Sequence, residues 1–326
     1  MKILVTGAAG FIGFHTSKAL LAAGNEVMGI DNLNTYYDRR LKQARLDQLR
    51  SEPRFVFHKL DIADTDDVLA VAAPWKPDAI CHLAAQAGVR YSLEAPFAYA
   101  RSNLLGHLTI LELARGLGDG LRHLVYASSS SVYGEQSEVP FREENASEAP
   151  ESLYAATKRS DELMTAAYSN LYGIPATGLR FFTVYGPWGR PDMAYWLFAE
   201  RMMRGEAIKV FNHGEMERDF TYIDDIVQPL LRIVDDAPER GRHEVYNIGG
   251  SSPVKLMDMI ATLERAFGLE AVKEMLPMQP GDVTRTYANV DKLVRDYNYR
   301  AKFDLETGLV SFAHWFKTWR RMGVET

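Results

Sequence analysis

The sequence predicts an α/β fold in which a doubly wound parallel sheet is accompanied by a smaller C-terminal α/β lobe. In the first half of the chain, short apolar runs alternate with segments of helical periodicity, a pattern typical of βαβ units. After about residue 186 this alternation is lost, and a turn-rich loop follows at residues 186–191. The chain has 326 residues, which suits one large α/β unit or two lobes.

Each expected element follows from its apolar pattern. Strands are predicted where short apolar runs lie between turn signals, and helices where apolar residues recur every three to four positions. Apolar runs at 220–233 and 244–248 indicate that the C-terminal part returns to the first lobe. The strands are expected at residues 2–6, 26–30, 55–60, 79–83, 122–128 and 176–181, and the helices at 13–23, 65–73, 95–117, 153–172 and 193–204.

The first strand runs directly into a glycine-rich turn of the form GxxGxxG, which spans Gly7 to Gly13. Between a strand and a helix, such glycines permit a tight turn and let the backbone approach a pyrophosphate, while the helix N-terminus offers free N–H groups. This context predicts a Rossmann-type dinucleotide-binding domain over residues 1–186, re-entered at about 220–248. Residues 187–326 are then expected to form mainly a substrate-binding lobe.

Residues at the ends of the following strands should face the same crevice. Asp31, after the second strand, can accept both adenosine ribose hydroxyls and would repel a 2′-phosphate, so NAD is favoured over NADP. Asp61 ends the third strand, where it suits either an adenine contact or a cap of the next helix. The small residues of Leu83-Ala84-Ala85 leave room for a cofactor, although packing explains them equally well.

A tyrosine and a lysine four residues apart, Tyr154 and Lys158, begin the predicted helix 153–172. Residues at this spacing share a helix face. An ammonium beside a phenol stabilises the phenolate, which suits the phenol to proton transfer near neutral pH. The serine run 128–131 ends a strand at the same crevice. These features predict a serine that holds a substrate hydroxyl while Tyr154 removes its proton and hydride passes to nicotinamide.

Composition excludes several other classes. The net charge of −6 argues against nucleic acid as the main partner. The single cysteine, Cys81, rules out an internal disulfide and a CxxC-type metal site, and no metal is expected. No apolar run approaches the ~20 residues needed to span a bilayer. Because residues 2–5 already form a predicted strand, no signal peptide is expected, and we predict a cytoplasmic protein without a membrane partner.

Taken together, these motifs resemble the extended short-chain dehydrogenases/reductases over nearly the whole chain. Within that group, residues 31–34, 83–92, 179–187 and 218–225 resemble nucleotide-sugar 4-epimerases. The closest subgroup is the UDP-glucuronate 4-epimerases, which are similar through residues 186–193 and 210–214. This resemblance implies interconversion of UDP-glucuronate and UDP-galacturonate through a transient 4-keto intermediate, with NAD tightly bound.

The resemblance also implies roles for matching residues. Tyr154 would be the acid/base and Lys158 its electrostatic partner, with Ser129 or Ser131 as the catalytic hydroxyl. Arginine's fork suits the UDP diphosphate. The expected cofactor residues are Gly7, Gly10, Phe11, Ile12, Gly13, Asp31, Asn32, Asp61, Ile62, Leu83, Ala84, Ala85, Asn103, Ser128, Tyr154 and Lys158. The expected substrate residues are Arg218 and Arg285 for the diphosphate, Phe211 near the uracil, and Thr183, Arg190 and Arg90 for the C6 carboxylate.

Several alternatives remain open from the sequence. Epimerisation of UDP-glucose or UDP-N-acetylglucosamine, and decarboxylation of UDP-glucuronate, share the same first oxidation. A 4,6-dehydratase commonly has an Asp-Glu pair where this chain has Ser130-Ser131, so elimination is not expected. A catalytically silent NAD-binding regulator is expected to lack Tyr154 or Lys158. The resemblance implies a homodimer formed through helices 95–117 and 153–172, although their apolar stripes also suit packing on the sheet.

Overall fold

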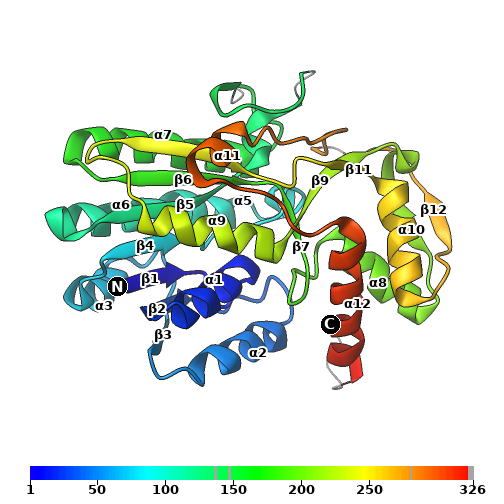
Figure 1. Cartoon of the computed structure of the whole chain (residues 1–326), viewed down its shortest axis with the longest axis horizontal. Helices are drawn as coiled ribbons and strands as arrows, with labels where there is room; N and C mark the ends of the chain where they lie inside the picture. The colour runs from blue at the N-terminus through cyan, green and yellow to red at the C-terminus, as the bar shows by residue number, and fades with distance from the viewer. Residues whose placement is uncertain (136–137, 146–147, 280, 322–326) are drawn as a thin grey trace.

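The computed structural model describes residues 1–135, 138–145, 148–279 and 281–321. Among these residues, the centre of the fold is a seven-stranded sheet in the order β10-β6-β5-β4-β1-β2-β3 (Figure 1). All of its strand pairs are parallel, which confirms the predicted fold class. The strands are β1 (Lys2–Thr6), β2 (Glu26–Asp31), β3 (Phe55–Lys59), β4 (Ala79–His82), β5 (His123–Ser129), β6 (Ala176–Phe181) and β10 (His243–Ile248).

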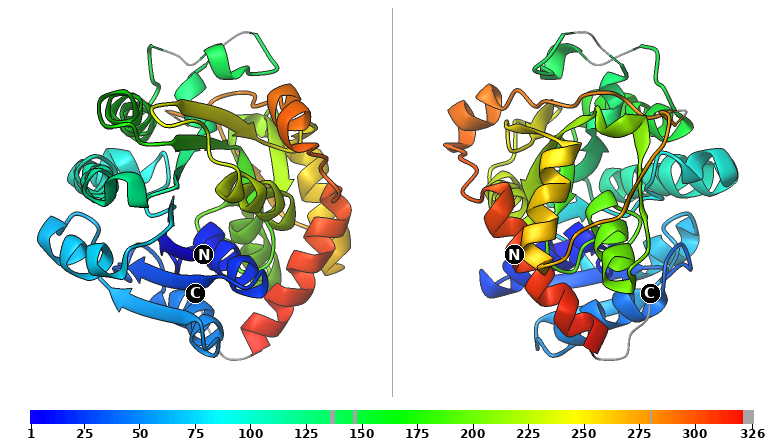
Figure 2. Two further views of the ribbon diagram at one scale, coloured as in Figure 1. Left: turned by 60° about the vertical axis from the view of Figure 1, so that its left-hand side comes forward. Right: turned by 90° about the vertical axis from the view of Figure 1, so that its right-hand side faces the viewer.

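Helices cover both faces of this sheet (Figure 2). One face carries α1 (Phe11–Ala22), α2 (Arg39–Arg50) and α9 (Ile223–Asp235), and the other carries α3 (Thr65–Trp75), α6 (Gly106–Leu117) and α7 (Leu153–Tyr172). The chain runs outward from β1 through β2 to β3, then returns to β4 on the other side of β1. In open α/β sheets this reversal opens a ligand crevice beyond the carboxyl ends of the strands.

The C-terminal half forms smaller sheets and helices at one end of the main sheet (Figure 1). In the described part of the chain, one small sheet has the order β11-β9-β7 and a second pairs β12 with β8. The strands are β7 (Thr183–Tyr185), β8 (Ile208–Val210), β9 (Glu217–Tyr222), β11 (Pro253–Lys255) and β12 (Lys273–Met275). The helices are α8 (Ala194–Arg204), α10 (Leu256–Phe267), α11 (Asp291–Tyr297) and α12 (Leu305–Arg321).

Helix α7 has the bounds that its sequence predicts, because both of its ends carry strong signals. Ser152 caps the N-terminus by accepting a hydrogen bond from the backbone N–H of Ala155 at 3.1 Å. Gly173 ends the helix in the left-handed conformation, with φ of 67°. The helix therefore begins at Leu153, and it presents Tyr154 and Lys158 from its first two turns.

The predicted helix 95–117 is instead divided into α5 (Pro96–Tyr99), a π-helical turn η1 (Ala100–Leu105) and α6, preceded by the short α4 (Tyr91–Glu94). Pro96 stands at the start of α5, where proline is tolerated because that N–H needs no helical partner. Helices α2, α10, α11 and α12 were not expected. No described helix combines the length and apolar character needed to cross a membrane.

Candidate active site

A cavity of about 890 Å³ lies beyond the carboxyl ends of the central strands and extends into the C-terminal half. It has the size of a cofactor or ligand site. The structure gathers most of the expected residues on its wall: Gly7, Gly10, Phe11, Ile12, Gly13, Asp31, Asn32, Ile62, Leu83, Ala84, Ala85, Arg90, Ser128, Ser129, Ser131, Tyr154, Lys158, Thr183, Arg190, Phe211 and Arg218. Asp61, Asn103 and Arg285 lie outside its described wall.

The glycine turn has a shape that side chains would destroy. Gly7 adopts φ of +71°, and a Cβ there would lie 2.8 Å from the backbone nitrogen of Ala84. A Cβ at Gly13 would lie 2.1 Å from the carbonyl oxygen of Gly7. Glycine at both positions therefore brings β1, α1 and the end of β4 close together. The N-terminus of α1 is left facing the cavity, as a dinucleotide pyrophosphate requires.

Asp31 is held rigidly at the end of β2. Its carboxylate accepts hydrogen bonds from the backbone N–H groups of Ala9 at 3.2 Å and Leu33 at 2.8 Å. Lys42 of α2 lies 4.0 Å from the same carboxylate and donates to Asn34 at 2.8 Å. Burial lowers the pKa of Lys42. Lys42 lines the cavity beside Asp31 and was missed from the sequence, because the helix that carries it was not predicted.

Asp61 organises the loop that follows β3. It accepts hydrogen bonds from Ala63 N–H at 2.9 Å and from the side chain of Asn32 at 3.4 Å, and Arg101 lies 3.5 Å away. These contacts tie the end of β2 to the loop after β3. Asp61 therefore supports Ile62, which does line the cavity.

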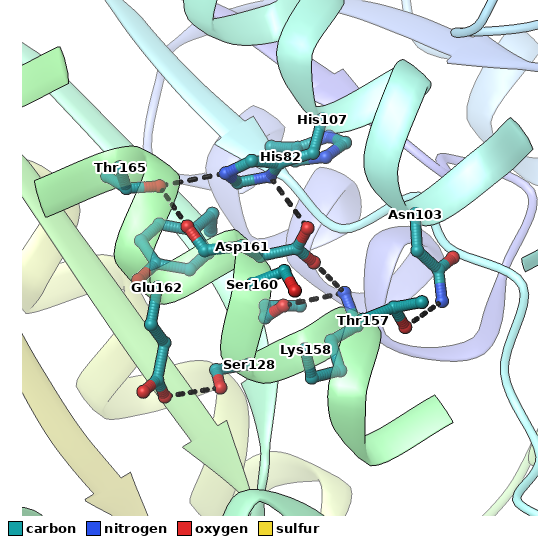
Figure 3. Close-up of polar contacts among 12 residues, drawn as sticks. His82, Asn103, His107, Ser128, Thr157, Lys158, Ser160, Asp161, Glu162 and Thr165 are labelled. Carbon is teal, nitrogen blue, oxygen red and sulfur yellow. Dashed lines mark hydrogen bonds and ion pairs between the residues drawn. The ribbon is translucent and has the colours of Figure 1, made fainter. Parts of the chain in front are cut away.

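Asn103 lies on the π-helical turn and connects two segments next to the cavity through its side chain. It accepts a hydrogen bond from Gln86 N–H at 2.8 Å and donates to the Gln86 carbonyl at 3.1 Å. It also donates to the hydroxyl of Thr157 at 2.9 Å, one residue before Lys158 (Figure 3). The loop after β4 is thereby fastened to α7. Such π turns recur at functional sites.

Tyr154 and Lys158 both line the cavity. The Lys158 ammonium donates to the carbonyl oxygen of Ala127 at 3.0 Å and to Asp161 Oδ2 at 3.0 Å (Figure 3). The ring of Tyr154 meets that of Tyr99 edge-on, with centroids 6.1 Å apart. Two of the three Lys158 donors are therefore used by the protein, and the third remains for a ligand.

The serines at the end of β5 divide into two groups. Ser128 donates its hydroxyl to Glu162 at 2.7 Å and is buried. The hydroxyls of Ser129 and Ser131 are hydrogen-bonded to each other, and Ser131 N–H donates to Ser129 Oγ at 3.2 Å. Because both of the latter line the cavity, the geometry keeps Ser129 and Ser131 as a pair of candidate hydroxyls.

Arg190 enters the cavity from the loop after β7 and is held by a carboxylate. Its guanidinium donates twice to Asp192, at 3.0 Å and 2.6 Å, and Tyr36 donates to Asp192 at 3.0 Å. Burial disfavours the charge of Asp192, but the Arg190 guanidinium outweighs it and lowers the pKa of that carboxyl. Thr183, at the start of β7, lines the same cavity. Because only one edge of the Arg190 guanidinium contacts Asp192, its other N–H groups can donate to an anion.

A buried arginine that the sequence did not reveal fixes this loop. Arg45 of α2 donates to the carbonyl oxygens of Ala9 at 2.9 Å, Trp188 at 2.6 Å and Gly189 at 2.8 Å. Trp188 is in the left-handed region, with φ of 61°, which is costly for a residue with a Cβ. Arg45 therefore joins the glycine turn to the loop that carries Arg190.

Arg218 is partly buried on the cavity wall and donates to the backbone carbonyls of Glu217, Thr284 and Val283, the last at 2.6 Å. Burial lowers its pKa. In the described part of the chain, no carboxylate forms an ion pair with it. Arg285 differs, because it pairs with Glu217 at 2.8 Å, is half-exposed and lies away from the cavity. Arg218 is thus the better-placed of the two for an anionic ligand.

Arg90 and Phe211 meet near Arg218. The Arg90 guanidinium lies over the Phe211 ring, 4.9 Å from its centroid, and pairs with Asp282 at 2.8 Å. The ring and the guanidinium offer a flat, partly charged surface on the cavity wall. Among the described residues there is no group of three or more His, Cys, Asp or Glu side chains that could hold a metal ion.

Comparisons with known proteins identify the family of this chain. The family described as NAD dependent epimerase/dehydratase matches residues 3–249. An uncharacterised 37.6 kDa protein of Escherichia coli O111:H- is 51% identical, over 97% of this chain and 98% of its own. A probable UDP-glucuronate 4-epimerase of Rhizobium meliloti strain 1021 is 43% identical, over 97% of each chain. The crystal structure of UDP-glucuronic acid 4-epimerase from Bacillus cereus, in complex with UDP-glucuronic acid and NAD, is similar with a TM-score of 0.90 and 35% identity, over 98% of this chain and 100% of that chain.

Proposed function

The chain belongs to the NAD-dependent epimerase/dehydratase family, and from this premise we propose that it is a UDP-glucuronate 4-epimerase. It interconverts UDP-glucuronate and UDP-galacturonate by inverting C4, with NAD as its cofactor. The resemblance to nucleotide-sugar epimerases is thereby confirmed. The observation that carries the proposal is one cavity whose wall holds the glycine turn, Tyr154 with Lys158, and the half-buried Arg190.

The residues present fit NAD. The turn from Gly7 to Gly13 is a cradle that a Cβ would fill, and its backbone N–H groups suit a pyrophosphate. Asp31 would hold the adenosine ribose hydroxyls, and Ile62 and Ala84 would flank the cofactor. Lys158 would use its third N–H on the nicotinamide ribose. When bound, NAD supplies a reversible hydride acceptor for C4 of the sugar.

Tyr154 performs the proton transfer in this proposal. Its phenolate takes the proton from the C4 hydroxyl as that carbon is oxidised, and it returns the proton when C4 is reduced. Ser129 or Ser131 donates to the C4 oxygen and holds it toward the phenol. The Lys158 ammonium stabilises the phenolate electrostatically. The cycle is redox-neutral, so the cofactor is not consumed.

The UDP end must stay fixed while the 4-keto sugar rotates, so that hydride returns to the opposite face of C4. Arg218 is partly buried on the wall and forms no ion pair with a carboxylate among the described residues, which suits it to the diphosphate. Phe211, with Arg90 across its face, offers a surface for the uracil. Arg285 would reach the diphosphate only after leaving Glu217, so we assign it a secondary role.

Arg190 and Thr183 are proposed to bind the C6 carboxylate. The 4-keto intermediate of a glucuronate is a β-keto acid. It loses carbon dioxide when the C5–C6 bond to the carboxylate is aligned with the π orbitals of the C4 carbonyl. Arg190 is held by Asp192 and Tyr36 at one edge, so its remaining N–H donors have a fixed direction. A fixed guanidinium keeps the carboxylate out of the geometry for cleavage and favours return of the hydride.

The test uses the purified protein without added NAD. Separate incubations contain UDP-glucuronate, UDP-glucose or UDP-N-acetylglucosamine, and the nucleotide sugars are resolved by chromatography and proton NMR. We expect UDP-galacturonate from UDP-glucuronate. UDP-xylose as the main product identifies a decarboxylase, and faster turnover of a neutral sugar identifies a different 4-epimerase. Tyr154→Phe should abolish turnover and retain UDP binding, which controls for contaminating activity.

We further propose the division into an NAD-binding lobe over residues 1–186, re-entered at about 220–248, and a mainly UDP-sugar-binding lobe over 187–326. The proposed homodimer forms through the outer faces of α5–α6 and α7. Large apolar side chains are exposed there, with Phe97 at 87% and Leu163 at 56%. Such residues mark interfaces when they gather on one face. A monomer in equilibrium sedimentation would remove the dimer.

A further inference from the structure

A buried polar cluster surrounds the side chain of Lys158 (Figure 3). It consists of Lys158 and Asp161 on α7, His107 on α6 and His82 on β4. Of these four residues, only Lys158 lines the cavity. Asp161 and His107 are almost completely buried, at 0% and 1% exposure. The proposed mechanism gives no role to this carboxylate, although burying a charge is costly unless it is well paired.

Asp161 contacts Lys158 through one oxygen only. Its Oδ2 accepts from the Lys158 ammonium at 3.0 Å. Among the described residues, its Oδ1 has no hydrogen-bond partner, and His107 Nδ1 lies 4.0 Å from it. A structural carboxylate buried for stability would be expected to use both oxygens. The one side-chain contact that Asp161 makes to another described residue within hydrogen-bond distance is with the ammonium of Lys158, which lines the cavity together with Tyr154.

The other groups around Asp161 do not neutralise it. Burial lowers the pKa of His107 to about 3, and it lowers the pKa of His82 well below its usual range, so both rings are neutral. His107 Nε2 is paired with Thr165 at 2.8 Å, and His82 Nδ1 with Thr6 at 2.7 Å.

The remaining neighbours lie on α7 and on the adjoining strands. Burial raises the pKa of the Tyr126 phenol on β5, so it stays neutral, and its hydroxyl is bonded to His243 of β10 at 2.8 Å. Burial also lowers the pKa of His243 to about 4. Glu162 is committed to Arg180 at 2.7 Å. Within the described residues, Lys158 is therefore the cation that Asp161 faces directly.

We propose that Asp161 is a positioning residue for the epimerisation: it orients the Lys158 ammonium and offsets part of its charge, and so sets the pH at which the Tyr154 phenolate forms. This inference rests on the proposed roles of Tyr154 and Lys158. With Ala127 and Asp161 each taking one N–H, the third N–H of Lys158 has one direction left, toward the cavity.

The sign of the effect follows from the charges. An ammonium favours a nearby phenolate, and a carboxylate behind that ammonium weakens the effect. Removing the carboxylate leaves the full positive charge facing Tyr154, so the phenolate persists to lower pH. Burial raises the pKa of Asp161 to about 6, so its charge is present above that pH and lost below it. Wild-type activity near neutral pH therefore reflects the ionised carboxylate.

The experiment compares pH–rate profiles of the holoenzyme. Asp161→Asn keeps the shape and removes the charge, and kcat for UDP-glucuronate is measured from about pH 5 to pH 9. We expect the acid limb to move down by about 1 pH unit, since Asp161 lies about 10 Å along the helix from Tyr154 and one unit charge at that distance has an effect of this size at an effective dielectric constant of about 20. Thr165→Val is the matched control, since it loosens the His107 contact and leaves the carboxylate in place.

Two further measurements keep the result decisive. Asp161→Ser removes the same charge, leaves room for water, and must move the limb in the same direction. A second measurement is an ultraviolet pH titration of Asp161→Asn and of the double variant Asp161→Asn/Tyr154→Phe. The difference between the two absorbance curves reports the ionisation of Tyr154 without any substrate. An acid limb that stays in place or moves up, or an equal shift in Thr165→Val, overturns the proposal. If UDP-glucuronate is not the substrate, wild type itself shows no turnover, whereas the phenolate titration still decides the role of Asp161.

Discussion

Replacing Arg45 by methionine tests whether this buried arginine holds the proposed carboxylate-binding loop. The change keeps an unbranched apolar stem and removes the guanidinium with its donors. Three buried carbonyl oxygens, those of Ala9, Trp188 and Gly189, lose their guanidinium partner. An unsatisfied buried acceptor costs about 1–3 kcal/mol, and partial relaxation or water entry recovers some of it. We therefore expect a loss of about 3–5 kcal/mol in the free energy of unfolding.

The same substitution should also impair catalysis. Trp188 holds a left-handed backbone conformation immediately before Gly189 and Arg190, and Arg45 binds two of the carbonyls of this segment. When those bonds are lost, the strained loop relaxes and Arg190 shifts. A displacement of about 1 Å costs on the order of 100-fold in rate. The loss should appear in kcat/KM for UDP-glucuronate, with UDP affinity nearly unchanged.

The assay combines urea unfolding followed by circular dichroism with initial rates and UDP binding at a temperature where the variant is folded. Arg54→Met is the matched control, because Arg54 also donates to two backbone carbonyls, those of Gly24 and Leu21, from an exposed position. It should cost less than about 1 kcal/mol. If Arg45→Met is as stable as Arg54→Met and turns over UDP-glucuronate normally, the loop does not depend on Arg45.

Three further outcomes are expected. Gly13→Ala places a Cβ 2.1 Å from the Gly7 carbonyl oxygen, so the purified protein should retain little NAD when denatured and assayed for released cofactor; full NAD occupancy would contradict the cradle. Arg190→Met should lower kcat/KM for UDP-glucuronate by about 100-fold or more while UDP binding stays within about 2-fold, and an equal loss of both would place Arg190 elsewhere. Glu162→Gln leaves Arg180 buried beside a neutral amide and should cost about 3–5 kcal/mol of unfolding free energy near neutral pH. Burial raises the pKa of Glu162, but its hydrogen bonds to Arg180 outweigh burial and the net pKa is lowered. The ionised carboxyl therefore stabilises wild type above about pH 4, and this contribution is lost as the pH falls further. The variant should lack this part of the acid-induced loss of stability, and an unchanged dependence of stability on acidic pH would refute the assignment.

Local signals account for the parts of the fold that the sequence predicts well. The glycine turn, the strand that precedes it and the caps of α7 each depend on residues close in sequence, so their geometry follows from short motifs. The interrupted helix 95–117 was not predicted as such because its π turn depends on Asn103, whose partners are Gln86 and Thr157. Contacts of that kind join distant segments and leave no periodic trace.

The site shows the same division. Residues on strand ends or in the α7 motif could be assigned to one crevice, since topology alone brings them together. Lys42 and Arg45 could not, because they lie on α2, a helix rich in charge whose buried leucines gave a weak signal. Arg285 was assigned to the site from a motif match, which gives only a position along the chain. The direction of its side chain depends on the ion pair with Glu217, which the motif does not reveal.

The backbone of Ala9 links the two ends of the cavity through hydrogen bonds on both sides of its Cα atom. Its N–H donates to Asp31, which is proposed to hold the cofactor ribose, and its carbonyl accepts from Arg45, which holds the loop of Arg190. Arg190 is in turn joined through Asp192 to Tyr36, only a few residues after Asp31. Through these hydrogen bonds, the glycine turn and the loop that is proposed to bind the carboxylate are both connected to Ala9. A change that loosens the glycine turn should therefore also disturb recognition of the sugar acid.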